Sequence, residues 1–278
     1  TLNNIVLTIQ NYMSNYVLII ALLGAGLWFS FRLGFIQVRG FGEGMRRTFG
    51  GLFSKKGEAG ADGMSSFQAL ATAIAAQVGT GNIAGAATAL AIGGPGAIFW
   101  MWIAAFLGMA TIYAEAIMAQ KYKTVGADGQ VTGGPVYYIR AAFKGTFGKV
   151  LAGIFAILIT LALGFMGNAV QSNSIAASFH TAFGIPQWIM GLVVAVIAIF
   201  VFMGGMKRIA KVTETIVPFM AALYIIGSLI VIIYNYKNIP YAFASIFIGA
   251  FSPSSVVGGA AGATVKLALT KGVARGLF

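Results

Sequence analysis

The stretch Gln77-Val-Gly-Thr-Gly-Asn82 decides how this sequence folds, because it stands in the middle of an otherwise apolar segment. That segment, residues 65–92, is long enough for a helix to cross the hydrocarbon layer, which takes about 20 apolar residues. Gly79 and Gly81, on either side of Thr80, weaken a helix at this point. We therefore predict a membrane-spanning helix that is broken over residues 77–82.

A break inside the bilayer indicates a ligand, because lipid offers the backbone no hydrogen-bond partners. Unwound backbone is tolerated there only where protein or a water-filled cavity supplies partners. The N–H groups that begin the outer half-helix attract a carboxylate, and the C=O groups that end the inner half-helix suit a cation. The alternative is a packing face, since Gly81 and Gly85 form a G-x-x-x-G pair. Gln77 and Asn82 favour a binding site, because buried amides need partners.

Composition indicates that the bilayer is the solvent for the rest of the chain as well. Hydrophobic residues make up 59% of the 278 residues and charged residues only 9%, whereas soluble domains carry about 25% charged residues. We expect an all-α polytopic membrane protein. Seven hydrophobic spans are predicted, at residues 15–36, 65–92, 95–122, 147–179, 186–206, 212–236 and 256–278. Residues 135–143 and 239–251 have the composition of helices that lie at the membrane surface.

Basic residues orient these spans. With the N-terminus outside, 14 of the 18 Lys and Arg residues fall on the three cytoplasmic stretches. An excess of basic residues on the cytoplasmic side is what sets topology in membrane proteins. We therefore expect a multi-pass protein of the cell membrane with its N-terminus outside. The same bias accounts for the net charge of +12 without a nucleic-acid partner.

A second polar stripe lies in the fourth span. Gly164, Asn168 and Gln171 follow helical spacing, so the two amides share a face. Phe165 and Met166 precede them and could wall a small pocket. Interhelical hydrogen bonding through buried amides is an equally good interpretation of this stripe.

Residues typical of enzyme sites are scarce. The chain has no cysteine, one histidine and no nucleotide-binding G-x-x-x-x-G-K-[ST] loop, so we expect neither an enzyme nor a cofactor. Glu115 lies in the third span, where an acid is a functional candidate. A structural ion pair with Lys121, Lys123 or the basic residues of 207–211 is the favoured interpretation of Glu115. A proton carrier is the alternative.

Five motifs along the chain carry a family resemblance. They are Gly79-Thr-Gly-Asn-Ile-Ala-Gly85, Gly93-Gly-Pro-Gly-Ala-Ile-Phe-Trp-Met-Trp102, Gly108-Met-Ala-Thr-Ile-Tyr-Ala-Glu115, Thr132-Gly-Gly-Pro-Val-Tyr-Tyr138 and Gly272-Val-Ala-Arg-Gly-Leu-Phe278. Together they resemble the alanine or glycine:cation symporter family over nearly the whole chain. The resemblance implies a leucine-transporter-like fold with two inverted repeats of five helices.

This implied fold divides the chain into three parts. Residues 1–64 would be an extra N-terminal helix and a cytoplasmic loop. Residues 65–236 would be the first five-helix repeat, and residues 237–278 an outer surface segment and the start of the second repeat. Because members of the family continue well past Phe278, we expect these 278 residues to be part of a longer protein.

The resemblance also implies roles at the break. The backbone amides of Thr80 and Gly81, next to Gly79, would hold the substrate carboxylate. The backbone carbonyls of Ala75 and Val78 would bind sodium. Further substrate-site residues would complete the pocket from several spans: Gln77, Asn82, Phe165, Met166, Gln171 and Gly276.

The function implied is symport, in which inward sodium movement drives uptake of a small neutral amino acid, alanine or glycine. Sodium would be the coupling ion, with no other cofactor. The small residues Gly79, Gly81 and Gly164 leave room for a small substrate. Two alternatives remain at this point: proton-coupled transport that uses Glu115, and a channel or a membrane scaffold that transports nothing.

Overall fold

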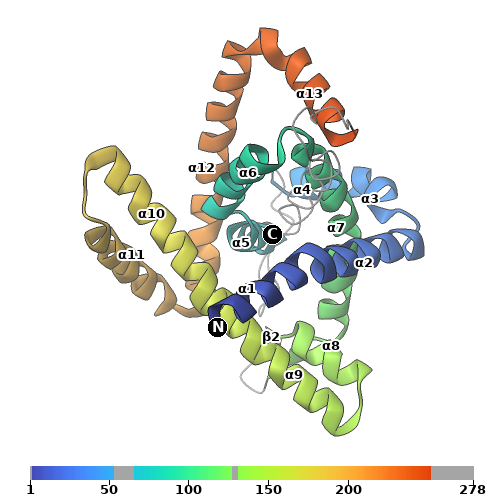
Figure 1. The fold of residues 1–278 in the computed structure, drawn as a ribbon. Helices are drawn as coiled ribbons and strands as arrows, with labels where there is room; N and C mark the ends of the chain where they lie inside the picture. The colour runs from blue at the N-terminus through green and yellow to red at the C-terminus, as the bar shows by residue number, and fades with distance from the viewer. Residues whose placement is uncertain (1, 53–65, 127–130, 252–278) are drawn as a thin grey trace. The chain divides into compact units, whose positions relative to one another are not determined.

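The computed structural model describes residues 2–52, 66–126 and 131–251, and most of these residues are helical (Figure 1). The helices are α1 (Leu2–Tyr12), the π-helix η1 (Met13–Val17), α2 (Leu18–Arg32), α3 (Ile36–Arg39), α4 (Phe41–Leu52), α5 (Ser66–Gln77), α6 (Thr80–Gly93), α7 (Gly96–Lys121), α8 (Pro135–Ala142), α9 (Gly145–Ile159), the π-helix η2 (Thr160–Gly167), α10 (Asn168–Phe183), α11 (Gln187–Phe202), α12 (Gly205–Tyr234), the 3-10 helix η3 (Tyr236–Asn238) and α13 (Ile239–Phe251). Two short antiparallel strands, β1 (Thr124–Val125) and β2 (Val131–Thr132), precede α8.

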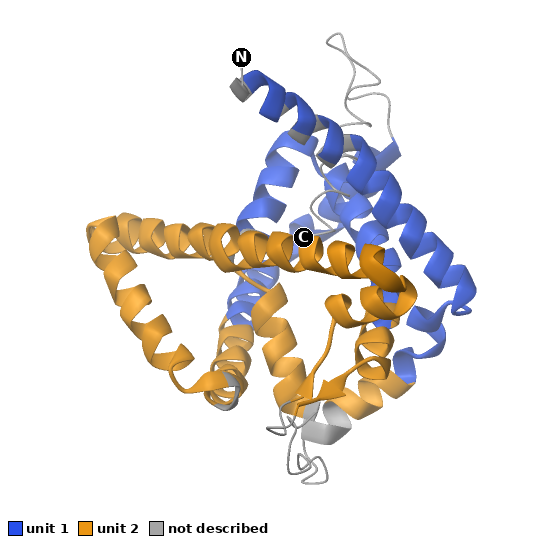
Figure 2. Ribbon diagram, turned by 90° about the horizontal axis from the view of Figure 1, so that it is seen from below, with its two compact units in different colours: residues 1–42, 82–113, 224–278 blue, residues 43–81, 114–223 orange. Residues whose placement is uncertain are grey.

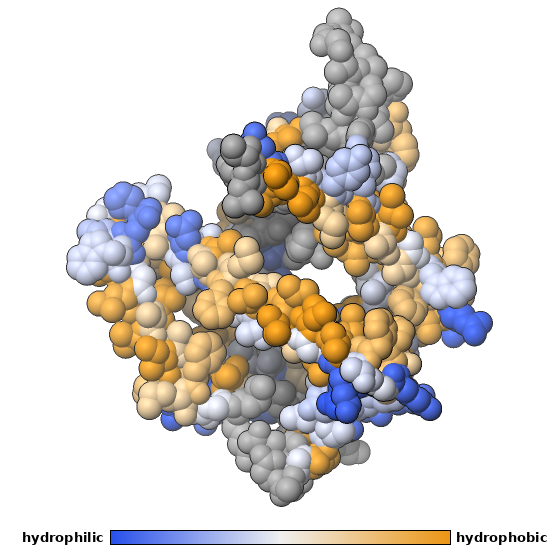
Figure 3. Space-filling model, turned by 60° about the horizontal axis from the view of Figure 1, so that its bottom comes forward, coloured by the Kyte–Doolittle hydropathy of each residue, from blue (hydrophilic) through white to orange (hydrophobic). Residues whose placement is uncertain are grey.

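Within the described residues, three helical segments are long and apolar enough to cross a membrane: Gly96–Lys121, Gly145–Phe183 and Arg208–Tyr234. Shorter apolar helices cover Leu18–Arg32, Asn82–Gly93 and Gln187–Phe202. Large apolar side chains on these helices are exposed, as Trp28 (68%) and Phe200 (67%) illustrate, and apolar residues run along the helices visible in Figure 3. Such surfaces suit lipid, which confirms the all-α membrane class. The count of seven spans stays a prediction, and residues 256–278 lie outside the described part.

The chain forms two compact units, coloured in Figure 2. Unit 1 contains residues 1–42, 82–113 and 224–278, and unit 2 contains residues 43–81 and 114–223. The predicted first repeat, residues 65–236, coincides with neither unit and stays a prediction.

Unit 1 is built on close helix packing through small residues. A Cβ placed on Gly26 of α2 would lie 2.8 Å from the Cβ of Leu107 in α7, so only glycine lets these helices approach so closely. Likewise, a Cβ on Gly249 of α13 would lie 2.9 Å from the backbone nitrogen of Gly96. The Phe99 ring packs edge-on against that of Phe251, with 4.9 Å between centroids. The segment predicted at the membrane surface, 239–251, is thus the helix α13 and packs on α7.

Unit 2 contains two helical hairpins, α8–α9 and α10–α11, which stand at opposite ends of a long helical segment in Figure 1. The second hairpin turns at Gly184, whose φ of +70° is strained for other residues and whose N–H donates to the His180 carbonyl. Between the hairpins, α9, η2 and α10 form one continuous apolar segment of 39 residues. This segment carries the predicted polar stripe of the fourth span into unit 2.

Candidate functional site

The helix that the sequence predicts to be broken is interrupted in the structure. Helix α5 ends at Gln77 and α6 begins at Thr80, so Val78 and Gly79 lie outside both helices. The Val78 N–H still donates to the Ile74 carbonyl, with 2.8 Å between the atoms. Because an α-helix leaves its last four carbonyls and first four amides without partners of its own, this break presents both kinds of backbone group within a few residues.

The predicted backbone ligands fall on the two sides of the break. Ala75 and Val78 belong to the last turn of α5 and the residue after it, where carbonyls point along the helix axis. Thr80 and Gly81 open α6, where amides point the opposite way. These are the backbone groups that a cation and a carboxylate would use, and their roles as ligands stay predictions.

Gln171 of α10 lies directly against the break within unit 2. A Cβ built on Gly79 would lie 2.9 Å from the amide carbon Cδ of Gln171 and closer still to its nitrogen. Gly79 therefore serves two purposes: it relaxes the helix, and it makes room for the Gln171 amide. The structure thus brings together two of the predicted site residues, which are 92 positions apart in the sequence.

The π-helix η2 precedes Gln171 in the same long segment, and the sequence did not predict it. Wider turns of this kind are frequent at functional sites. Phe165 and Met166 lie on η2, but their side chains are 68% and 69% exposed, so they wall no pocket within the described residues. Asn168, which follows η2, donates its side-chain N–H to the Gly164 carbonyl at 2.9 Å. Their roles at a substrate site stay predictions.

A polar contact line joins α5 to α12 in unit 2, and the sequence did not predict this line either. The Gln68 Nε2 donates to Glu214 Oε2 at 3.0 Å, and the hydroxyls of Thr72 and Thr213 lie 3.2 Å apart. Gln68 and Thr72 are one turn apart, so they share a face of α5. Consequently α5 is held by α12 along this face and approached by Gln171 at its end.

Comparison with known proteins identifies the family. The model of the sodium:alanine symporter family matches residues 1–278. This chain belongs to the sodium:alanine symporter family. Membership confirms the resemblance described above and places the chain among transporters rather than enzymes.

Curated members of the symporter family are similar over most of this chain. It is 42% identical over 277 residues to the sodium/alanine symporter AgcS of Methanococcus maripaludis, which covers 99% of this chain and 59% of that protein. It is 46% identical over 257 residues to the putative sodium/proton-dependent alanine carrier protein YrbD of Bacillus subtilis (92% and 50%). It is 42% identical over 277 residues to the probable sodium/glutamine symporter GlnT of Bacillus subtilis (100% and 55%). The chain thus spans between half and three fifths of these relatives' length.

The favoured interpretation of the sequence paired Glu115 with nearby basic residues, and the structure differs from it for two of them. Glu115 forms no ion pair with Lys121 or Lys123, since the ion pairs found within the described ranges belong to Glu43. Its charge instead acts on Tyr138 of α8, whose pKa is raised first by burial and second by the Glu115 carboxylate. The expected pairing with these two lysines is therefore wrong, because neither lysine at the end of α7 folds back onto the acid.

The remaining predicted site residues of the symporter chain are only partly described. Gln77 is an exposed residue at the end of α5. Asn82 lies in the first turn of α6. It belongs to unit 1, where it begins the stretch 82–113. Gly276 lies outside the described residues. Their part in substrate binding stays a prediction.

Proposed function

We propose that the protein to which this chain belongs couples inward sodium movement to the uptake of a small neutral amino acid, alanine or glycine. The observation that carries the proposal is the helix break at Val78 and Gly79 with the Gln171 amide against it. Membership of a symporter family and the printed names of relatives, which include alanine and glutamine symporters, support it.

The proposed site uses the two ends of the break. The amides of Thr80 and Gly81 hold the substrate carboxylate, and the carbonyls of Ala75 and Val78 hold sodium. In a low-dielectric surrounding, bound cation and carboxylate stabilise each other, so each ligand binds more tightly when the other is present. This mutual dependence is the thermodynamic basis of coupling.

Side chains complete the proposed pocket. Gln171 and the neighbouring Gly79 border it, and Gln77 and Asn82 offer amide groups to substrate or ion. Phe165, Met166 and Gly276 belong to it through the family resemblance alone. The alanine carriers among the relatives support a substrate with a methyl side chain.

The proposed fold is the leucine-transporter-like inverted repeat, with residues 65–236 as the first repeat and the N-terminus outside. In this fold the broken helix is the first helix of the repeat, and substrate and ion bind to it near the membrane midplane. A membrane potential of 100 mV then contributes about 2.3 kcal/mol for each sodium ion that enters.

Uptake by the full-length protein in proteoliposomes tests the proposal. We expect radiolabelled alanine to accumulate with an inward gradient of sodium and not with one of choline. Asn82→Ala should abolish accumulation, whereas Asn235→Ala should not, because the Asn235 amide donates to the Val231 carbonyl of α12, the helix that it follows. Uptake that does not depend on sodium would contradict sodium coupling. Equal activity of the two variants would contradict the proposed substrate site at Asn82.

Proton coupling through Glu115 is the second candidate, favoured by the absence of an ion pair with Lys121 or Lys123. It predicts uptake that persists without sodium, depends on a pH gradient and is lost in Glu115→Gln. Sodium-dependent uptake that survives Glu115→Gln would eliminate this candidate.

A further inference from the structure

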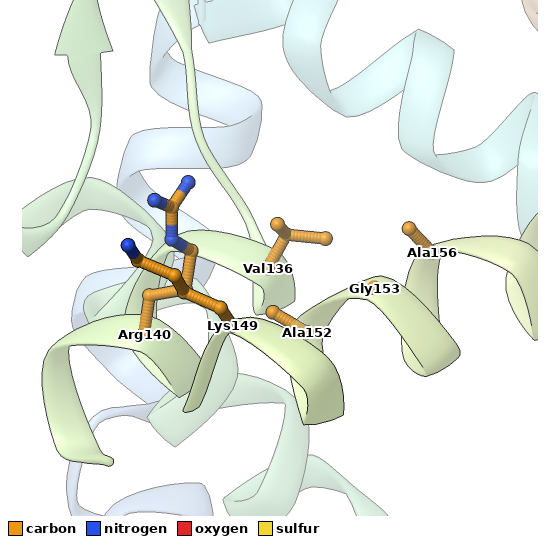
Figure 4. A pocket seen from close by; sticks show the side chains of 6 residues that line it. All are labelled: Val136, Arg140, Lys149, Ala152, Gly153 and Ala156. Carbon is orange, nitrogen blue, oxygen red and sulfur yellow. The ribbon is translucent and has the colours of Figure 1, made fainter. Parts of the chain in front are cut away.

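The hairpin of α8 and α9 in unit 2 lines an open cleft of about 280 Å³, which is separate from the proposed transport site. It is lined by Val136, Arg140, Lys149, Ala152, Gly153 and Ala156 (Figure 4). In Figure 4 the charged groups of Arg140 and Lys149 gather on one side of the cleft, and Val136 and Ala156 lie further along it. The lining is therefore divided into a cationic end and an apolar end.

The two cations have no carboxylate partner in the described part of the chain. Residues 131–213 contain no Asp or Glu, and the ion pairs found among described residues involve Arg46 and Arg47 with Glu43. Both side chains are exposed at one end of the cleft, where the two like charges repel each other. An anion between Arg140 and Lys149 would turn this repulsion into attraction.

Packing holds the two cationic helices in this arrangement. Gly145 adopts a φ of +80° at the turn, and a Cβ on Gly148 would collide with the carbonyl oxygen of Phe143. The rings of Phe143 and Phe147 pack edge-on, with 5.6 Å between centroids. The close approach of α8 and α9 thus fixes the helices that carry Arg140 and Lys149.

The apolar end extends the cleft along a membrane-spanning segment. α9 is the first part of the long apolar segment Gly145–Phe183. Ala156 lies seven residues beyond Lys149, which is about 10 Å along a helix. A Cβ on Gly153 would meet nothing within 4 Å, so the wall is open at this point. A groove of small residues that starts at two cations and runs into the hydrocarbon layer matches a phosphate followed by an acyl chain.

We propose that this cleft binds an anionic phospholipid, with the headgroup phosphate between Arg140 and Lys149 and an acyl chain along Val136, Gly153 and Ala156. Arginine and lysine are the usual phosphate partners in proteins, and basic clefts beside membrane helices suit anionic headgroups. A soluble phosphate would use the cations but leave the apolar wall uncovered. The site is independent of the proposed transport function.

Titration of the full-length protein in detergent with phosphatidylglycerol, read by native mass spectrometry, tests this proposal. Phosphatidylcholine with the same acyl chains serves as the neutral comparison. We expect phosphatidylglycerol to bind at least about tenfold more tightly than phosphatidylcholine, since each basic residue contributes a factor of about five. The preference should disappear in Arg140→Gln/Lys149→Gln and persist in Lys144→Gln, a cation of the same hairpin that does not line the cleft.

A second variant keeps the test decisive if the double substitution fails to fold. Gly153→Leu fills the open wall and leaves both charges in the protein, and it should weaken phosphatidylglycerol binding while the protein elutes as a single folded species. Loss of the preference in Lys144→Gln to the same extent would show diffuse charge attraction and overturn the site. Displacement of phosphatidylglycerol by millimolar inorganic phosphate, or unchanged binding in Gly153→Leu, would show a soluble-anion site and overturn the lipid assignment.

Discussion

At the scale of single residues, Gly79 carries two constraints at once. It interrupts the helix between α5 and α6, and its missing side chain is the space into which the Gln171 amide fits. Both constraints concern the position of a Cβ atom on Gly79. A methyl group there would therefore disturb the helix break and displace the Gln171 amide. Tyr138 shows another kind of effect: partial burial and, second, the charge of Glu115 raise its pKa.

Gly79→Ala should reduce kcat/KM for alanine uptake by at least about tenfold, the effect of roughly 1.4 kcal/mol. The physical reason is that the new methyl group displaces Gln171. Gly227→Ala is the matched control, because a Cβ on Gly227 would meet nothing within 4 Å. Normal uptake by Gly79→Ala would show that the proximity of Gly79 and Gln171 has no role in binding.

The pKa of Tyr138 should fall partway towards its ordinary value in Glu115→Gln, because burial remains and the negative charge is removed. A raised pKa means that the folded state holds the phenolic proton more tightly than the unfolded state. Its contribution to stability is therefore complete below a pH of about 10 and is lost as the pH rises beyond that value.

This shift is measured by alkaline titration of tyrosinate absorbance. The absorbance of Tyr138→Phe is subtracted from that of the parent protein, so that the difference reports Tyr138 alone. Glu214→Gln is the control, since Glu214 is not among the groups that raise the Tyr138 pKa. An unchanged difference titration in Glu115→Gln would contradict the described proximity of Glu115 and Tyr138.

At the scale of helices, α5 depends on its neighbours more than on its own sequence. α5 has 12 residues, which is too short for a helix to be stable alone in water. Its apolar residues are also only weakly gathered on one face. The contacts of Gln68 and Thr72 with α12 supply side-chain hydrogen bonds at two successive turns. A short helix held by polar contacts of this kind can be released at modest cost.

Glu214→Leu should loosen α5, because it removes the acceptor of the Gln68 amide. The expected result is a severalfold faster amide hydrogen exchange over residues 66–77, equivalent to about 1 kcal/mol for one lost hydrogen bond. Thr215→Ala serves as the control on the same helix turn, since the Thr215 hydroxyl donates only to the Lys211 carbonyl within α12. Equal exchange in the two variants would mean that α12 does not hold α5.

At the scale of the whole molecule, the membrane is a structural partner of the chain. Most large apolar side chains of α9 to α12 are exposed, and a soluble protein with such surfaces would aggregate. The basic residues lie mainly between the spans, where headgroups and the cytoplasm attract them. The protein's orientation is therefore a property of the chain and bilayer together.

Labelling in intact cells tests the predicted orientation. In a full-length background without other cysteines, Lys123→Cys should react with a membrane-impermeant maleimide only after the cells are opened. Lys237→Cys, on the predicted outer side, should react in intact cells. The opposite pattern would invert the proposed topology and place the α6 end of the break on the cytoplasmic side.

The sequence by itself determined the membrane class, the family and the place of the helix break. These features depend on local chemistry: long apolar runs need lipid, and Gly79 and Gly81 weaken a helix wherever they stand. The limits of α13 followed in the same way, since residues 239–251 are a short apolar run between an interfacial lysine and a polar stretch. The expected pairing of Glu115 with Lys121 or Lys123 was wrong because proximity in sequence does not specify the direction of a side chain.

Only the tertiary structure decided which distant residues meet. Gln171 lies at Gly79, Gln68 bonds to Glu214, and Arg140 shares a cleft with Lys149, although nothing in the pattern of any one segment required these pairs. Each pair depends on how two helices cross, and the crossing is set by small residues such as Gly148 that let backbones approach. Local propensity acts over a few residues, whereas helix packing joins positions as much as 146 residues apart, so the geometry of the site could come only from the fold.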